Sequence, residues 1–187
     1  MADAAERTLI GGGTDSSNEG VPQKDRLLAL EIRSRKFGFA VFDAPPRLLE
    51  WGVRHYTGRD ILKRRIAFLL ELYVPTTVVL RRRDIRAPET RRVFAAAVRT
   101  IRAESRRLSI EVLSLNTLDI RHFFAEHGCA TKHQIASLIA KRFDELSWKL
   151  PPKRKAWESE NYNAAIFDAV ATALLFFTGG TGSENKM

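Results

Sequence analysis

The first third of the chain alternates short apolar runs with turn residues, which is the pattern of a strand meander. A basic turn separates the first two runs and Pro45-Pro46 separates the second from the third, so the three runs are expected to pair as antiparallel strands. One acidic residue, Glu31, lies within the first run. A buried carboxylate is costly unless something pairs with it, so Glu31 is either a structural anomaly or part of a site. The predicted strands are 27–33, 37–43 and 48–56.

Helices and strands alternate through the rest of the chain. A helix is predicted between Thr57, which stands in a cap-like position, and Pro75. Thr131 and Gln134 form a capping-box pattern that begins a later helix. Because a helix lies between the first strand and the strand at 76–80, these two strands are expected to be parallel. The remaining predictions are helices at 88–106, 118–126, 131–148 and 163–177 and a strand at 110–115.

This order of elements predicts one α/β domain. Its mixed five-stranded sheet would contain three antiparallel strands followed by two parallel strands, with helices flanking it. The chain has 187 residues and 44% hydrophobic content, which is enough for one such core. We expect the domain at 25–178, between flexible tails at 1–24 and 179–187. No apolar run approaches the length needed to span a bilayer, and Cys129 is the only cysteine, so we expect a cytoplasmic protein.

The balance of charge points to an anionic partner. The formal net charge is +9, which makes nucleic acid the first candidate. Ten arginines lie between Arg81 and Arg107, and the forked donors of arginine suit phosphate groups. The alternative is that these arginines form ordinary solvated faces. The candidate nucleic-acid-binding residues are Arg35, Arg83, Arg91, Arg92, Arg99 and Lys132.

Four segments carry motifs that occur in the same order in one known family. They are a strand with a basic turn at 28–35, a second strand at 37–41, a Gly-x-x-x-Lys-x-Gln helix start at 127–135, and an Asp-Ala-x-Ala-x-Ala helix at 167–173. Together they resemble the RuvC Holliday-junction resolvases of the ribonuclease-H-like superfamily. The resemblance covers residues 27–178 and implies a ribonuclease-H-like fold.

The resemblance also implies a site. In active members of the family, four acids hold two divalent cations, Mg²⁺ or Mn²⁺, which activate water and stabilise the leaving oxygen. Glu31 and Asp168 match two of these acids and are the candidate metal ligands. With Lys132, which matches a family lysine, they are also the candidate catalytic residues. Arg81 and Ala165 stand where the family has the other two acids. Because an arginine repels metal ions, we favour a salt bridge in which Arg81 neutralises Glu31 and Asp168.

Three functions remain open from the sequence. The first is a RuvC-like pseudoenzyme of DNA recombination and repair that binds branched or duplex DNA through its arginines. The second is an active structure-specific endonuclease that uses Mg²⁺ or Mn²⁺, with Glu31, Asp168 and either Asp84 or Glu160 as its acids. The third is a scaffold that binds a protein partner. The resemblance further implies a homodimer.

Overall fold

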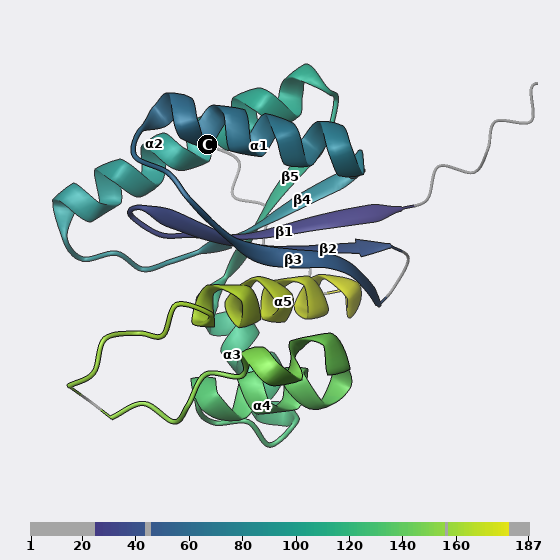
Figure 1. Cartoon of the computed structure of the whole chain (residues 1–187), viewed down its shortest axis with the longest axis vertical. Helices are drawn as coiled ribbons and strands as arrows, with labels where there is room; N and C mark the ends of the chain where they lie inside the picture. Colours follow the sequence, from purple (N-terminus) through teal and green to yellow (C-terminus); the bar gives the residue numbers. More distant parts are fainter. Residues whose placement is uncertain (1–24, 44–45, 156, 180–187) are drawn as a thin grey trace, which may run out of the picture.

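The computed structural model describes residues 25–43, 46–155 and 157–179, which contain five strands and six helical segments (Figure 1). The tails expected at 1–24 and, from residue 180, at the C-terminus lie outside this part of the chain. None of the described helices is long and apolar enough to cross a membrane. The strands are β1 (Arg26–Ile32), β2 (Lys36–Asp43), β3 (Arg47–His55), β4 (Thr77–Arg82) and β5 (Glu111–Asn116). The helices are α1 (Arg59–Tyr73), α2 (Pro88–Arg107), α3 (Thr117–Glu126), α4 (Lys132–Arg142), the 3-10 helix η1 (Asp144–Lys149) and α5 (Ala164–Phe177).

The strands form one sheet in the order β3-β2-β1-β4-β5. β2 pairs antiparallel with both β1 and β3, whereas β4 pairs in parallel with both β1 and β5. A short turn joins β1 to β2, and helices α1 and α2 provide the crossovers that parallel strands need. The predicted mixed sheet of three antiparallel and two parallel strands is therefore confirmed.

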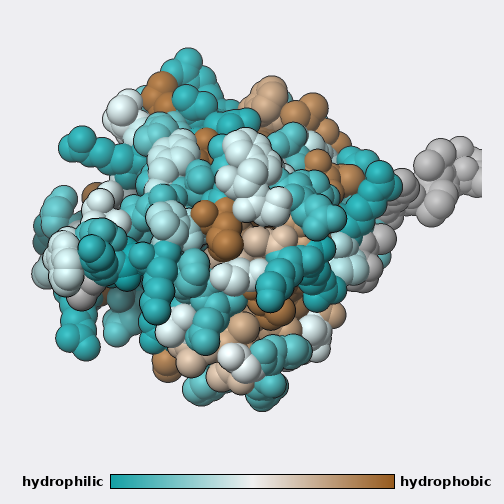
Figure 2. All heavy atoms as spheres, turned by 60° about the horizontal axis from the view of Figure 1, so that its bottom comes forward, coloured by the Kyte–Doolittle hydropathy of each residue, from teal (hydrophilic) through white to brown (hydrophobic). Residues whose placement is uncertain are grey.

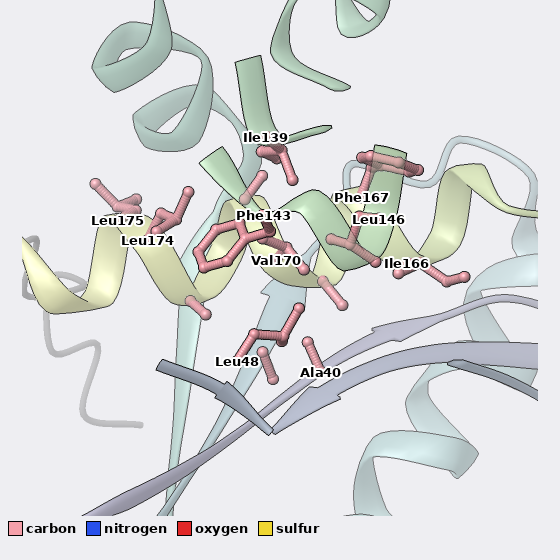
Figure 3. Packing of buried hydrophobic residues seen from close by; sticks show 14 of the residues in the cluster. Ala40, Leu48, Ile139, Phe143, Leu146, Ile166, Phe167, Val170, Leu174 and Leu175 are labelled. Atoms are coloured by element: carbon pink, nitrogen blue, oxygen red, sulfur yellow. The ribbon is translucent and has the colours of Figure 1, made fainter. Parts of the chain in front are cut away.

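Helices cover both faces of the sheet (Figure 1). The α1 and α2 helices pack on one face, over Leu28 and Leu30 of β1, while α3, α4, η1 and α5 pack on the other, over Leu27 and Ala29. Figure 3 shows the second of these cores, with α5 lying between η1 and the sheet. Because side chains alternate along a strand, residue 31 also faces α5. The acidic residue of β1 is thus directed into the same layer as α5.

The predicted helix at 131–148 is too long. The capping box at its start is present, but α4 ends at Arg142 and Phe143 adopts an extended conformation. The ring of Phe143 lies edge-on to that of Phe42, with 5.8 Å between the ring centroids. Leu146, on the following η1, is fully buried. Helical spacing continues through this segment, but the chain breaks the helix so that both side chains reach the core.

The beginning of α1 also differs from the prediction. Gly58 is the N-cap residue, and no side chain caps this end of the helix. The carbonyl oxygen of Gly58 accepts a hydrogen bond from the amide of Leu62 at 3.1 Å. The predicted cap by Thr57 is therefore wrong, because the chain enters the helix one residue later.

At one point α5 lies against the backbone of β2. Gly38 pairs with Glu31 across the sheet, and a Cβ atom at position 38 would lie 2.1 Å from the carbonyl oxygen of Ala165. Only glycine leaves room for the helix backbone there. This contact brings the first turns of α5 close to the carboxylate of Glu31. It also agrees with the small residues that precede Asp168 in the sequence.

Gly38→Ala is expected to destabilise the protein. The added methyl group must push the backbone of α5 away from β2, and overpacking of this kind costs about 1–3 kcal/mol or more. Thermal unfolding measures the effect. The matched control is Gly52→Ala, where the nearest atom to a new Cβ is a ring carbon of Phe39 at 3.0 Å, which can shift. A Gly38→Ala variant no less stable than Gly52→Ala would contradict the close approach.

Candidate functional site

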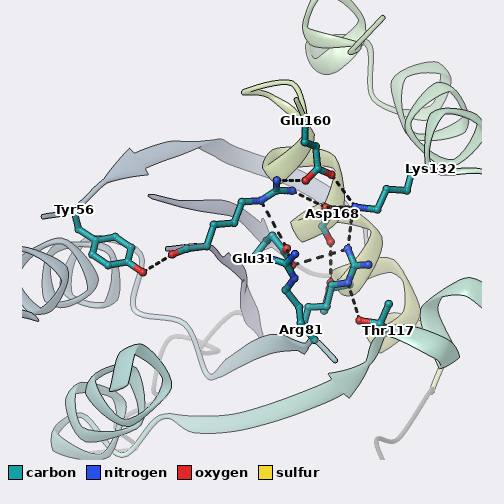
Figure 4. Close-up of polar contacts among 10 residues, drawn as sticks. Glu31, Tyr56, Arg81, Thr117, Lys132, Glu160 and Asp168 are labelled. Atoms are coloured by element: carbon teal, nitrogen blue, oxygen red, sulfur yellow. Dashed lines mark hydrogen bonds and ion pairs between the residues drawn. The ribbon is translucent and has the colours of Figure 1, made fainter. Parts of the chain in front are cut away.

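The carboxyl ends of β1 and β4 and the second turn of α5 converge at one end of the sheet (Figure 4). Glu31 lies near the end of β1 and Arg81 near the end of β4, and both are buried. Alternation directs both side chains toward α5. Asp168 on α5 lies opposite them. Two adjacent parallel strands and one helix thus create this site.

Seven charged side chains meet there and form what we call the ion cluster. Its centre is Asp168, which pairs with Arg81 Nη1 at 2.7 Å and with Arg33 Nη2 at 2.8 Å. Lys132 Nζ lies 2.8 Å from Glu160 Oε1 and 3.5 Å from Asp168 Oδ2. With all three carboxylates ionised, the four cations leave the cluster with a net charge of +1. The members are Glu31, Arg33, Arg81, Arg83, Lys132, Glu160 and Asp168.

The two central arginines are held in place by further hydrogen bonds. Arg33 bridges Asp168 and Glu160 with its two terminal nitrogens, and its own carbonyl oxygen accepts a hydrogen bond from the Tyr56 hydroxyl. Arg81 Nε donates to the Thr117 hydroxyl at 3.2 Å. The guanidinium of Arg81 is held at Nε and Nη1 and that of Arg33 at both terminal nitrogens, so each presents its donors in one geometry. The cluster is accordingly a built arrangement and not a chance meeting of surface charges.

Glu31 is the least compensated member of the cluster. Its nearest cations, Arg33 and Arg83, lie at 3.8 Å, and its Oε2 atom accepts no hydrogen bond from any described group. Burial, together with the charge of Asp168, raises the pKa of Glu31 to about 7, although the neighbouring arginines oppose this shift. A proton is therefore bound to Glu31 far above the pH at which an exposed glutamate loses it.

Glu160 shows the opposite shift. Burial acts against its charged form, but the hydrogen bond from Lys132 and the charge of Arg33 outweigh burial and lower the pKa of Glu160 to about 2. Glu160 is thus ionised at any ordinary pH and neutralises the outer cations of the cluster.

The stability of the protein should fall as the pH rises from 4.5 to 7. In this window the folded protein keeps a proton on Glu31 that the unfolded chain, with a pKa of 4.5, releases. The full loss amounts to about 3 kcal/mol. Urea unfolding at pH 5 and pH 8 measures it as the difference between wild type and Glu31→Gln, which cannot titrate there. Glu160 does not interfere, because its window lies below pH 4.5. Wild type should lose stability relative to Glu31→Gln between pH 5 and pH 8. Equal free energies of unfolding for the two proteins at pH 8 would contradict this assignment.

The residues of the cluster do not fit a pair of divalent cations. The oxygens of Asp168, a candidate metal ligand, are taken by two guanidinium groups, and Arg81 separates Asp168 from Glu31. Within the described ranges, no group of three or more His, Cys, Asp or Glu side chains could hold a metal ion. The salt bridge that the sequence predicts between Arg81 and the two carboxylates is present, with its short contact to Asp168.

Asp84 does not join the cluster. The strand ends at Arg82, and Asp84 follows in the exposed loop before α2. No ion pair among the described residues involves it. The acid set of an active nuclease would therefore have to consist of Glu31, Glu160 and Asp168, each of which faces an arginine or a lysine.

Two of the predicted DNA-binding arginines, Arg35 and Arg83, follow the carboxyl ends of β1 and β4 at the same end of the sheet. Arg35, in the turn after β1, lines a cavity of about 540 Å³ together with Arg59 and with Val93 and Ala96 of α2. This shared cavity places the turn beside the first half of α2, as Figure 1 also shows. Arg92 is exposed and pairs weakly with Glu89 at 3.9 Å.

The remaining predicted residues have different surroundings. Arg91 Nε donates to the carbonyl oxygen of Ile85 at 3.1 Å and so braces the loop before α2. Arg99 is exposed two turns further along α2. Arg83 and Lys132 belong to the ion cluster, with partly exposed side chains. We call the basic rim the partly exposed Arg83 together with four exposed arginines, Arg35, Arg59, Arg91 and Arg92.

Arg33, which lies at the centre of the cluster, is not among the site residues that the sequence predicts. The sequence does indicate the position of Arg33, because it follows Glu31 by two residues and strand alternation directs both side chains to the same face of the sheet. Glu160 was considered only as an alternative metal ligand. It lies in the segment between η1 and α5, where no periodicity indicates its position.

No protein-family model and no curated protein matches the sequence. Solved structures do match. Thermus thermophilus RuvC, in complex with a Holliday junction substrate, is 16% identical with a TM-score of 0.64, over 83% of this chain and 96% of that one. The yeast mitochondrial Holliday junction resolvase is 13% identical with a TM-score of 0.60, over 80% of this chain and 76% of that one. The fowlpox virus resolvase is 13% identical with a TM-score of 0.51, over 82% and 99%.

These likenesses define the fold. The chain has a ribonuclease-H-like fold, in the form found in Holliday junction resolvases of the RuvC type. The fold expected from the resemblance of the four sequence segments is thereby confirmed.

Proposed function

We propose that the protein is a RuvC-like DNA-binding protein of recombination or repair that binds branched or duplex DNA without hydrolysing it. The observation that carries this proposal is the ion cluster. Resolvases of this fold are expected to gather acids around metal ions at this end of the sheet. In this chain, two arginines pair with Asp168 there, Arg81 at 2.7 Å and Arg33 at 2.8 Å. Cations that neutralise the carboxylates leave no ligand set for a metal-activated water.

Charge supports DNA as the partner. The chain has a net charge of +9, and Arg83 of the basic rim contacts Glu31 of the ion cluster at 3.8 Å. Phosphate contacts from arginine provide most of the affinity in sequence-independent binding. RuvC and the fowlpox virus resolvase have both been solved with Holliday junction DNA, which makes a four-way junction the first ligand to test.

Binding and cleavage are tested with the same substrates. A mobility-shift assay at low salt should show binding to a four-way junction and to a duplex, and addition of Mg²⁺ or Mn²⁺ should produce no cleavage. Cleavage that Asp168→Asn abolishes would overturn the degenerate site and establish the alternative, a metal-dependent endonuclease with Glu31, Glu160 and Asp168. The convergence of these three carboxylates favours that alternative over any that uses Asp84.

A protein scaffold is the outcome if neither DNA is bound. Figure 2 shows the side of the molecule that carries α3, α4 and α5, where hydrophilic side chains cover most of the surface and apolar atoms emerge in patches between them. Such a surface resembles an ordinary solvated face more than a large apolar interface. A homodimer, which the resemblance implies, would present two basic rims to one junction, and the size of the complex with DNA in solution tests it.

A further inference from the structure

The edge strand β3 carries aromatic side chains that the core does not cover. β3 is the outermost strand of the sheet, so one of its edges pairs with no other described strand. Trp51, Val53 and His55 alternate onto the α5 face. Val53 is buried in the core on that face, Trp51 is half-buried at its margin, and His55 is exposed. The face of the edge strand thus changes from core to surface along its length.

Each exposed ring of β3 contacts a second ring from another element. Trp51 meets Trp148 of η1 edge-on, with 5.9 Å between ring centroids, and His55 stacks on Tyr162 at 5.4 Å. The outer rings remain open to solvent, since Trp148 is 70% exposed and Tyr162 is 45% exposed. A run of four residues along a strand separates the two pairs by about 13 Å.

A lysine lies over each outer ring. Lys149 Nζ is 3.9 Å from the centroid of Trp148, and Lys36 Nζ is 4.6 Å from that of Tyr162. The acids of η1, Asp144 and Glu145, are at its other end. We call this surface the aromatic stripe, which consists of Lys36, Trp51, His55, Trp148, Lys149 and Tyr162.

Open rings combined with cations suit one kind of partner. Unpaired bases stack on exposed aromatic rings, while lysine or arginine contacts the phosphates between them. A duplex does not offer this contact, because its base faces are already stacked on one another. The stripe also leads to the ion cluster, since Lys36 lies within electrostatic reach of Arg33 and Glu160.

We propose that the aromatic stripe binds an unpaired strand of nucleic acid, in which bases take the places of Lys149 and Lys36 on the rings of Trp148 and Tyr162 and the two lysines turn to the phosphates. The inference rests on the proposed function, because it takes nucleic acid as the partner, and it adds a substrate class, which is DNA with unpaired nucleotides beside a duplex or branch point. The basic rim then holds paired segments and the aromatic stripe holds the single strand.

Equilibrium titration of a dye-labelled oligo(dT) with the full chain, followed by fluorescence anisotropy, tests the stripe. Trp148→Ala and Tyr162→Ala should each weaken oligo(dT) binding about tenfold. Trp148→Phe should retain most of the affinity, because it keeps a ring. The matched control is Phe68→Ala, which removes a ring that is 58% exposed on α1, in the opposite helical layer. Duplex affinity should change little in all of these variants.

The salt dependence of binding separates phosphate contacts from stacking. Lys149→Gln should lower the slope of log affinity against log salt by about 0.7 for single-stranded DNA, which corresponds to one phosphate contact. Oligo(dT) binding that is unaffected by Trp148→Ala and Tyr162→Ala overturns the stripe, and so does an equal loss of affinity for duplex. If the wild type binds duplex or junction but no oligo(dT), only this inference fails. If it binds no nucleic acid at all, the proposed function fails as well.

Discussion

Arg81→Met is expected to lower the free energy of unfolding by about 3–5 kcal/mol. Arg81 is buried, with 7% of its side chain exposed, and it lies between two carboxylates that it neutralises. Its removal leaves Asp168 with one fewer close cation and Glu31 with less opposing charge in a buried environment. Such uncompensated buried charge is among the most destabilising changes a single substitution makes. Urea unfolding at pH 8, where both carboxylates would ionise in the unfolded chain, measures the loss.

The adjacent arginine provides the control. Arg82 is exposed on the same strand, and its replacement by methionine should change stability by no more than about 0.5 kcal/mol. A second control uses the double variant Glu31→Gln with Arg81→Met, which removes a negative charge together with the positive one and should recover part of the stability. If Arg81→Met and Arg82→Met are equally stable, the ion pair at the centre of the site contributes nothing to folding.

Replacement of three exposed arginines should sharply reduce the salt dependence of DNA binding. Arg35, Arg92 and Arg99 belong to no part of the ion cluster, so a triple glutamine variant keeps the site intact. Three lost phosphate contacts lower the slope of log affinity against log salt by about 2.7 on duplex DNA. Between 50 and 200 mM salt, wild type should then lose about 40-fold more affinity than the variant. Fluorescence anisotropy with a labelled duplex measures both slopes.

A charge-matched variant tests whether position matters. Arg47 at the start of β3 and Lys141 and Arg142 at the end of α4 are exposed at the other end of these elements. Their replacement by glutamine removes the same net charge and should leave the slope nearly unchanged. Equal slopes in the two triple variants would mean that the overall charge of the chain governs binding, and that Arg35, Arg92 and Arg99 make no defined contacts.

Strand alternation was sufficient to predict the contact between Arg81 and the carboxylates. Glu31 and Arg81 lie on neighbouring parallel strands, and both side chains point to the face that α5 covers. Strand alternation also directs Arg33 to this face. The residue predicted from the basic turn was instead Arg35, which lies outside the ion cluster. The helix pattern was less reliable, because Phe143 leaves the helix to reach Phe42 across the core.

Other parts of the site depend on tertiary packing alone. Gly38 signals a close approach only once Ala165 is known to lie above it. Glu160 reaches the cluster because the segment between η1 and α5 folds back on Arg33 and Lys132, and nothing periodic in that segment indicates it. The aromatic stripe likewise combines residues from β2, β3, η1 and the segment before α5, which only the fold brings together.

The position of Glu160 determines from which side the ion cluster can open. Asp168 lies on α5, whose backbone rests on Gly38, and both Arg81 and Arg33 hold its carboxylate. Glu160, by contrast, lies outside any helix or strand, and its partner Lys132 is half exposed. An incoming phosphate can therefore take the place of one carboxylate on Lys132 while the sheet and α5 keep their positions. Such an exchange replaces one anion on Lys132 by another, so the charge beside the buried carboxylates changes little while the outer surface gains a ligand.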